Sequence, residues 1–89
     1  MIFVEAVIRL AELQWAQNDA EKTLDACLRA LELDPANESA HQMAMRAHAQ
    51  RGDRAAIARQ YQACKEVSES LFSLPPAEES EKLYRQLIA

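Results

Sequence analysis

The sequence predicts an all-α fold, a superhelix of two helical hairpins closed by a C-terminal capping helix. Three observations support this prediction. Hydrophobic residues make up 49% of the 89 residues and aromatic residues only 6%, with one glycine and three prolines, a balance that favours helices over strands. Turn signals at four places separate five segments in which apolar residues have helical spacing. A shift of 34 residues brings the pattern of the second half onto that of the first.

Two of the turn signals share one chemistry. Asn18-Asp19 and Gly52-Asp53 each join a residue that can take the left-handed conformation at a helix end to an aspartate that can cap the next helix. The other two signals, Asp34-Pro35 and the Ser-Leu-Pro-Pro segment at 73–76, contain prolines, which disrupt the interior of a helix. We therefore expect a helix to end at each of the four places.

The first hairpin is expected to run from Phe3 to Leu33, with its first helix ending at about Gln17. Apolar residues recur every three or four positions in both of its helices, which is typical of a helix face that packs on a core. The expected core residues are Phe3, Ala6, Val7, Leu10, Ala11, Leu13 and Gln14 in the first helix and Leu24, Cys27, Leu28 and Leu31 in the second.

The second hairpin is expected from Ala36 to about Leu71, with its first helix ending near Arg51. That helix is rich in alanine, and small residues allow a neighbouring helix to approach closely. The capping helix is expected from Ala77 to Ile88, after a proline pair that can begin a helix but not lie inside one. The expected core residues are Ala40, Ala44, Ala47, His48, Ile57, Tyr61, Cys64 and Leu71, and Leu83, Tyr84, Leu87 and Ile88 in the cap.

The 34-residue period is that of tetratricopeptide (TPR) units. Pro35 follows Leu31-Glu32-Leu33-Asp34, where the TPR template places its proline, whereas the template's Trp, Gly and Tyr are missing from both first helices. The sequence therefore predicts a divergent TPR-like domain over residues 1–89. Repeat one spans about 3–35, repeat two about 36–72 and the capping helix about 77–88.

Several stretches resemble the bacterial transcriptional activator domain. That family joins an A-H-x-x-x-M-R helix to a G-R-R-A-x-A-L-R-Q-Y-x-x-C type helix, which residues 40–46, 52–57 and 59–64 match in order and spacing. It continues into an L-G-x-x-P-S-P-E-T-x-x-L-Y type segment. Matching residues in 74–84 are Pro76, Glu79, Ser80, Leu83 and Tyr84, and departures from the family pattern are Ala58 for Leu, Ser73 for Gly and Glu78 for Pro.

The resemblance implies a regulatory interaction domain. In that family the domain follows a winged-helix DNA-binding domain or accompanies a nucleotide-binding module, and it mediates contacts that lead to transcription activation. The family's domain is longer than this sequence, so the resemblance implies a match to its C-terminal part, with a further helical region upstream.

Charge and hydropathy exclude several other classes of protein. The formal net charge of −4 opposes the neutralisation of phosphates on which nucleic-acid binding depends, so we expect no direct nucleic-acid contact from this segment. We expect no membrane span either, and the apolar start from Met1 to Val4 is too short for a signal peptide. Cys27 and Cys64 are too few for a disulfide framework, which agrees with a cytoplasmic protein.

No residue pattern indicates catalysis, a metal site or a cofactor. His41 and His48 lie two helical turns apart, but the further ligands that zinc usually requires are missing, so we expect His41 to take part in packing. Cys27 and Cys64 are expected to be buried, unreactive thiols without a neighbouring base. The sequence therefore predicts a protein that is not an enzyme, although an enzyme with an unrecognised site remains an alternative.

Trp15 allows two interpretations. It is a core residue that fills space between helices, or it lies on the concave face that the first helices of TPR-like units form. On the second interpretation, Trp15 and Arg46 face one groove that binds a protein or peptide. The predicted binding residues are Glu5, Glu12, Trp15, Gln42, Arg46 and Gln50.

The first helix also begins with a run of apolar residues that no preceding repeat covers. Because a stack of helical hairpins normally needs about three repeats, we expect a homodimer that buries Phe3, Val4 and Ile8. The predicted function is protein–protein interaction within a bacterial transcription regulator. The alternative is a stand-alone TPR adaptor whose protein or peptide partner is unrelated to transcription.

Overall fold

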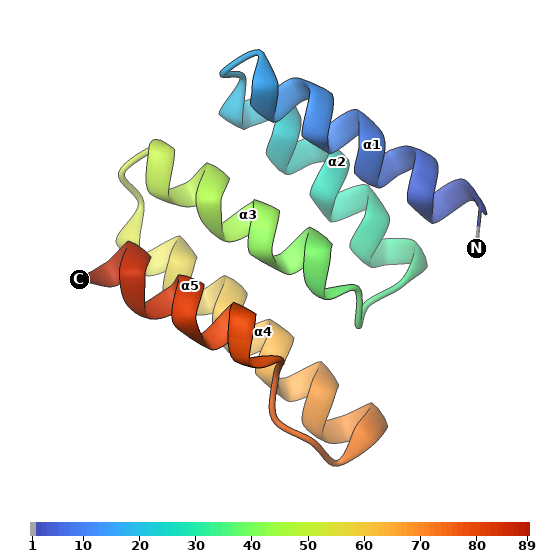
Figure 1. Ribbon diagram of the computed structural model, residues 1–89, viewed down its shortest axis with the longest axis vertical. Helices are drawn as coiled ribbons and strands as arrows, with labels where there is room; N and C mark the ends of the chain where they lie inside the picture. The colour runs from blue at the N-terminus through green and yellow to red at the C-terminus, as the bar shows by residue number, and fades with distance from the viewer. Residues whose placement is uncertain (1) are drawn as a thin grey trace.

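The computed structural model describes residues 2–89, which form five α-helices and no strand. The helices are α1 (Ile2–Ala16), α2 (Ala20–Leu33), α3 (Glu38–Gln50), α4 (Arg54–Phe72) and α5 (Glu78–Ile88). Figure 1 shows α1, α3 and α5 running in one direction in one layer, with α2 and α4 running back behind them. The shortest extent of 17 Å corresponds to two layers of helices. The predicted all-α arrangement of two hairpins and a capping helix is confirmed.

The turns after α1 and α3 have the same chemistry, as the sequence predicts. Asn18 and Gly52 take left-handed backbone conformations, with φ of 60° and 74°. The next residue caps the following helix in each case, because Asp19 accepts from the backbone N–H of Lys22 and Asp53 from that of Ala56, both at 3.0 Å.

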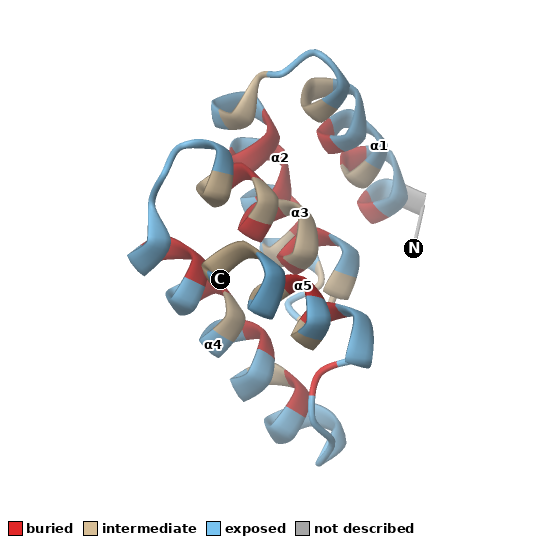
Figure 2. Cartoon of the chain, turned by 60° about the vertical axis from the view of Figure 1, so that its left-hand side comes forward, coloured by how far each residue is buried: buried red, intermediate tan, exposed pale blue. Residues whose placement is uncertain are grey.

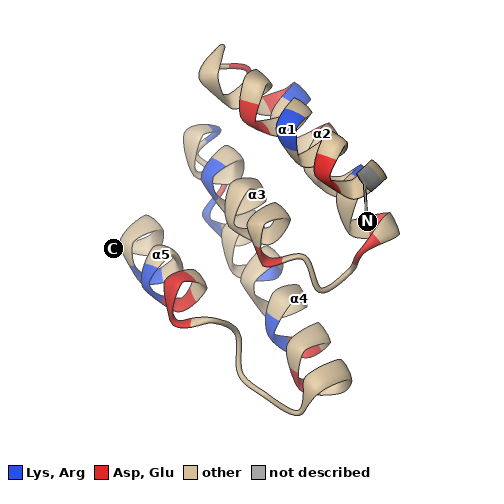
Figure 3. Ribbon diagram, turned by 45° about the vertical axis from the view of Figure 1, so that its right-hand side comes forward, with Lys and Arg blue, Asp and Glu red and all other residues tan. Residues whose placement is uncertain are grey.

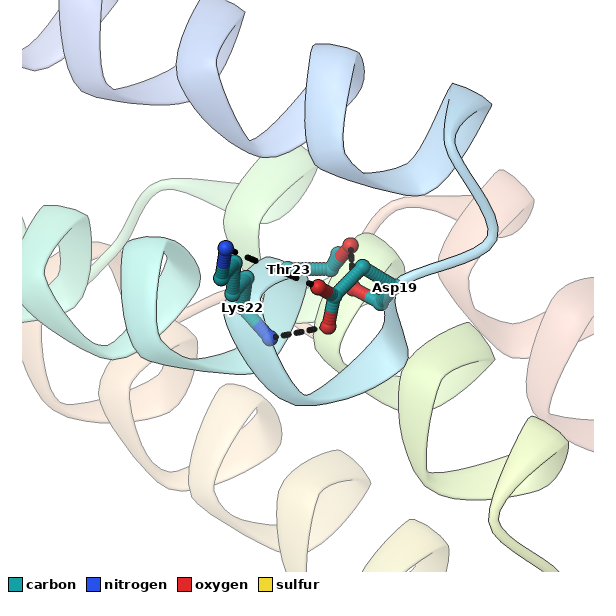
Figure 4. Close-up of polar contacts among 3 residues, drawn as sticks. All are labelled: Asp19, Lys22 and Thr23. Atoms are coloured by element: carbon teal, nitrogen blue, oxygen red, sulfur yellow. Dashed lines mark hydrogen bonds and ion pairs between the residues drawn. The ribbon is translucent and has the colours of Figure 1, made fainter.

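The cap of α2 includes two further contacts, which Figure 4 shows together with the backbone bond. Thr23 donates its hydroxyl proton to the carbonyl oxygen of Asp19 at 2.7 Å. The ammonium group of Lys22 lies 4.0 Å from the Asp19 carboxylate. A threonine four residues after the cap therefore stabilises this turn in addition to the aspartate.

The other helix starts differ from the expected positions. Asn37 is the N-cap of α3, with its side-chain oxygen 3.0 Å from the Ala40 nitrogen, so α3 begins at Glu38 and not at Ala36. α5 begins at Glu78, one residue after the expected Ala77, and both prolines of the 73–76 turn precede it as the sequence predicts. Ala77 is the N-cap of α5, and a cap is the residue just outside the helix.

Buried side chains form two clusters that share α3. The first lies between α1, α2 and α3, and it contains Val4, Val7, Ala11, Leu24, Ala26, Cys27, Ala30, Ala40, Ala44 and Ala47. The second lies between α3, α4 and α5 around Met45, Ile57 and Leu83. Figure 2 shows these buried positions along the inner faces of the helices. Because Ala40, Ala44 and Ala47 are fully buried, the predicted close approach at α3 is confirmed.

Several large apolar residues expected in the core are exposed instead. In α1 these are Phe3 at 57%, Leu10 at 39% and Leu13 at 60%. Leu28 and Leu71 are also exposed. The reason in α1 is geometric: its apolar residues occupy more than half of the helix circumference, and α2 and α3 cover only part of it.

The predicted self-association residues do not form one exposed patch. Phe3 is exposed, but Val4 is only 4% exposed and belongs to the first cluster of the chain's own core. Ile8 is half-buried against that cluster. The prediction is therefore wrong about Val4, because α2 and α3 pack on the side of α1 that carries it.

None of the described helices is both long and apolar enough to span a membrane.

Candidate functional site

Three helices meet at a shallow cavity of 480 Å³ that is lined by Trp15, Arg46, Ala49, Gln50 and Leu87. These residues lie near the C-terminal ends of α1, α3 and α5. The ends come together because the three helices run in the same direction within one layer (Figure 1). The structure thus places Trp15 and Arg46 in one groove, as the repeat pattern predicts.

Trp15 takes part in both of the roles that the sequence left open. The side chain is half-buried and packs against the first core cluster, so it fills space between helices. It also lines the cavity, so part of the indole is open to a ligand. Leu87 and Ala49 complete an apolar floor from the side of the second cluster. We name the five lining residues the Trp15 groove.

Arg46 is the cation of the Trp15 groove. It is half-buried and forms no ion pair with any of the residues that the structure describes. Two further arginines lie nearby: Arg51 directly follows Gln50, and Arg54 donates to the carbonyl oxygen of Ile88, next to Leu87. The C-terminal ends of α1, α3 and α5 bring partial negative charge to this region, and the positive charges of the arginines offset it.

The other predicted binding residues lie elsewhere. Glu5 and Glu12 line a separate cavity of 260 Å³ on the same side of α1, together with Ile8, Arg9, Asn37 and Ser39. Gln42 donates from its amide nitrogen to the Ser80 hydroxyl oxygen at 2.9 Å, so the capping helix occupies that amide. Of the predicted set, the structure brings together only Trp15, Arg46 and Gln50 in one place. Leu87 could not be assigned to the groove from the sequence, because no repeat predicts where α5 lies.

The position of α5 depends on Glu38 at the start of α3. Its carboxylate accepts from the backbone N–H of Ala77, at 2.9 and 3.1 Å for the two oxygens, and from the hydroxyl of Ser80. Ala77 makes no side-chain capping bond of its own, so Glu38 caps α5 from a different helix. The same contacts hold Leu87 in place beside Trp15 and Arg46, since they fix the helix that carries it.

His41 is a packing residue, as the sequence predicts. It is buried, and its Nε2 donates to the carbonyl oxygen of Pro35 at 2.9 Å. Gln60 donates its amide proton to Nδ1 of His41, also at 2.9 Å, which completes a neutral ring with one donor and one acceptor. His48 is half-buried, and burial lowers its pKa from the usual 6.5. Burial therefore favours the neutral form of His48, while both ring nitrogens of His41 are engaged within the fold.

The two cysteines are free, buried thiols. Burial raises the pKa of Cys27 to about 12, and it raises the pKa of Cys64 to about 11. A thiol with such a pKa is protonated at neutral pH and is a poor nucleophile.

Within residues 2–89, no three histidine, cysteine or acidic side chains gather as a metal site would require. Figure 3 shows acidic and basic residues interspersed along the helices, with no helix dominated by basic residues.

Comparison with known proteins agrees with the resemblance found in the sequence. The family model of the bacterial transcriptional activator domain matches residues 2–88, which is nearly the whole chain. A search of curated proteins and a search of solved structures find no match. The family is regulatory, and its name describes a domain of transcription activators. The chain therefore belongs to the bacterial transcriptional activator domain family.

Proposed function

We propose that this domain is a non-catalytic protein-interaction module of a bacterial transcription regulator and that it binds its partner in the Trp15 groove. The observation that carries the proposal is the combination, in one cavity, of a half-buried tryptophan and a half-buried arginine that forms no ion pair with the described residues. Aromatic and arginine side chains in such settings contribute most of the affinity of protein interfaces.

The chemistry of the groove favours a particular kind of partner. Trp15 and Leu87 offer an apolar surface, while Arg46 offers two or more donors to a carboxylate. A segment with an apolar side chain next to an acidic one fits both. Arg51 and Arg54 at the rim add to the attraction for an acidic segment.

Three observations support the absence of catalysis and of DNA contact. The cysteines are protonated at neutral pH, and the buried histidine His41 already has both ring nitrogens engaged within the fold. The net charge of −4 disfavours the phosphate backbone of DNA. On this proposal another part of the regulator contacts the promoter.

Fluorescence offers a direct test, because Trp15 is the single tryptophan of the chain. The probes are short amidated peptides that contain a Leu-Glu pair and matched peptides that contain Leu-Gln instead. We expect the Leu-Glu peptides to change the Trp15 emission and to bind more tightly than the Leu-Gln peptides. Arg46→Gln should weaken binding of the Leu-Glu peptides by about tenfold, since a charge-assisted hydrogen bond is worth roughly 1.5 kcal/mol or more.

Arg59→Gln is the matched control, because Arg59 is exposed on α4 and does not line the groove. It removes the same charge and should leave the affinity nearly unchanged. Equal weakening by both variants would mean that the peptides sense net charge only. No emission change with either kind of peptide would exclude the Trp15 groove as the binding site for such segments.

The link to transcription is tested in the intact regulator. Trp15→Ala should reduce activation of a reporter gene, while occupancy of the promoter by the regulator stays unchanged. This separation follows from a domain that contacts protein and not DNA. If Trp15→Ala activates the reporter normally although the wild-type domain binds the Leu-Glu peptides, the domain serves as an adaptor unrelated to transcription.

A further inference from the structure

A second cavity, of 350 Å³, lies beside the turn between α2 and α3. Its walls are Pro35, from that turn, and four residues from the C-terminal half of α4, which are Glu66, Val67, Ser70 and Leu71. We name these five residues the Val67 groove. Pro35 precedes the start of α3, whereas the Trp15 groove takes residues from its end, and a helix of 13 residues is roughly 20 Å long. The two grooves therefore lie at opposite ends of α3.

The apolar residues of the Val67 groove lie outside both buried clusters. Val67 and Leu71 are four residues apart, so they share one face of α4. The residues of α4 that pack inward are others, Ile57 and Cys64 among them, while Leu71 is 61% exposed and Val67 is half-buried. An apolar surface that lines a cavity and leaves such a leucine exposed is typical of an interaction site.

The two walls of the groove are held in place by buried side chains. The carbonyl oxygen of Pro35 accepts from Nε2 of His41 at 2.9 Å, and Nδ1 of His41 accepts from the amide nitrogen of Gln60, also at 2.9 Å. Gln60 belongs to α4, so these two bonds connect the α2–α3 turn to the helix that forms the other wall. The groove is therefore formed before a ligand arrives, which lowers the entropic cost of binding.

The chain around the Val67 groove is acidic. Residues 31–37 and 66–74 supply all five lining residues, and they contain no lysine or arginine but four carboxylates, those of Glu32, Asp34, Glu66 and Glu69. Both α2 and α4 end on this side of the molecule (Figure 1), so their C-terminal carbonyl groups add partial negative charge. Lys65, the nearest basic residue along α4, is two positions from Val67 and so lies on nearly the opposite face of the helix.

Glu66 is the charged residue of the groove itself. It forms no ion pair with any residue in 2–89, and its carboxylate accepts from the amide of Gln62, one turn earlier in α4, at 3.3 Å. We propose that the Val67 groove binds a basic segment of a partner protein, which inserts an aliphatic side chain between Pro35 and Val67 and places a lysine or arginine beside Glu66. The Trp15 groove favours an acidic segment, so the domain offers two surfaces of opposite charge preference.

Fluorescence anisotropy of labelled peptides tests the charge preference. The probes are acetylated, amidated peptides with two Leu-Lys pairs and matched peptides with Leu-Gln pairs. We expect the Leu-Lys peptides to bind about fivefold more tightly, as a partly exposed charge pair allows. Glu66→Gln should remove this preference by weakening only the Leu-Lys peptides. Glu21→Gln is the matched control, because Glu21 is an exposed residue in the first turn of α2, at the far end of that helix from Pro35.

Two neighbouring residues test the apolar half of the groove. Leu71 and Phe72 are 61% and 57% exposed, but only Leu71 lines the cavity. Leu71→Ser should weaken both kinds of peptide by about fivefold to tenfold, because binding no longer removes a leucine side chain from water. Phe72→Ser should leave both affinities nearly unchanged. Circular dichroism should show that both variants are folded, because neither side chain belongs to a buried cluster.

Three results would overturn the proposal: equal affinity for the Leu-Lys and Leu-Gln peptides, equal effects of Glu66→Gln and Glu21→Gln, or equal effects of Leu71→Ser and Phe72→Ser. A mass above one chain without peptide, lowered by Leu71→Ser alone, would also overturn it and make a second copy the occupant. Unlabelled Leu-Lys peptides should leave the Trp15 emission unchanged, and a change would place them in the Trp15 groove instead. Failure of these tests leaves the proposed role of the Trp15 groove intact, because the two grooves share no residue.

Discussion

Three residues outside the helices hold a left-handed backbone: Asn18 at φ 60°, Gly52 at φ 74° and Ser73 at φ 55°. Glycine takes this conformation without strain, and asparagine tolerates it better than most residues do. Serine has no such advantage. Ser73 nevertheless ends α4 there, and its backbone N–H donates to the carbonyl oxygen of Glu69. The turn after α4 is therefore the most strained of the three.

Opposite substitutions at two of these turns should change stability in opposite directions. Ser73→Gly removes a strain of roughly 1–2 kcal/mol and adds some flexibility to the unfolded chain, so the free energy of unfolding should rise by about 0.5–1 kcal/mol. Gly52→Ala should lower it by about 1 kcal/mol or more, and backbone strain is the cause because a Cβ at Gly52 would meet nothing within 4 Å. Urea denaturation measures both. A loss of stability in Ser73→Gly would contradict the strain at this turn.

The buried thiols predict how stability depends on alkaline pH. Burial holds the pKa of Cys27 at about 12 and that of Cys64 at about 11, whereas the unfolded chain has thiols near 9.0. Above pH 9 the unfolded state therefore releases thiol protons that the native state keeps. The free energy of unfolding should fall as pH rises, approaching about 1.4 kcal/mol per pH unit for each thiol well above pH 9.

Cys27→Ala separates this effect from other alkaline effects. The variant should be less stable at neutral pH, because it leaves a small cavity, but its stability should fall less steeply between pH 9 and pH 10. Tyr61, whose pKa is raised above 10.0 mainly by burial, adds a similar loss only at higher pH. Urea denaturation at a series of pH values measures the slopes. Equal slopes for the variant and the wild type would show that Cys27 is not shielded from water as the structure indicates.

At the scale of helices, local chemistry determined where most elements begin and end. The Asn18-Asp19 and Gly52-Asp53 signals were sufficient because a left-handed residue and a capping aspartate act within one turn of the chain. The buried side of α1 could not be predicted in the same way. Apolar residues extend around more than half of that helix, so the positions of α2 and α3 decide which of them are covered.

The same distinction applies to the candidate site, where some residues could be predicted from the sequence and others depend on how the helices pack. Trp15 and Arg46 could be predicted to meet because the repeat places them on equivalent helices. Gln42 is hydrogen-bonded to Ser80 and does not line the groove, whereas Leu87 does. Both outcomes depend on how α5 packs against α3. The sequence holds no second copy of α5 to compare, and the carboxylate that caps it comes from Glu38, about forty residues earlier.

Glu38 should therefore control the stability of α5 more than that of the other helices. Glu38→Gln removes the charge and weakens the contacts to the Ala77 N–H and the Ser80 hydroxyl, and we expect a loss of about 1–3 kcal/mol in the free energy of unfolding. Amide hydrogen exchange should accelerate mainly in α5. Glu79→Gln is the control and should have little effect, because Glu79 is an exposed residue of α5 and the hydrogen bonds from α5 to Glu38 do not involve it. Uniform acceleration over all five helices would argue against a local cap.

The whole molecule is held together through α3, which supplies residues to both core clusters. Ala40, Ala44 and Ala47 pack toward α1 and α2, while Met45 packs with Ile57 and Leu83 toward α4 and α5. Neither cluster is complete without α3. A helix shared in this way couples the two halves, because unfolding one half removes one wall of the other.

The coupling predicts a single unfolding transition that both halves report. Met45→Ala should lower the free energy of unfolding by about 2–4 kcal/mol, because Met45 is fully buried in the second cluster. Trp15 packs against the first cluster, yet its fluorescence transition should move to lower urea concentration by the same amount as the far-UV circular dichroism transition. Met43→Ala is the control with a smaller loss, because Met43 is half-buried. If the Trp15 transition stays in place while the circular dichroism transition splits in two, α1 and α2 unfold independently of α4 and α5, and sharing α3 does not couple the two halves.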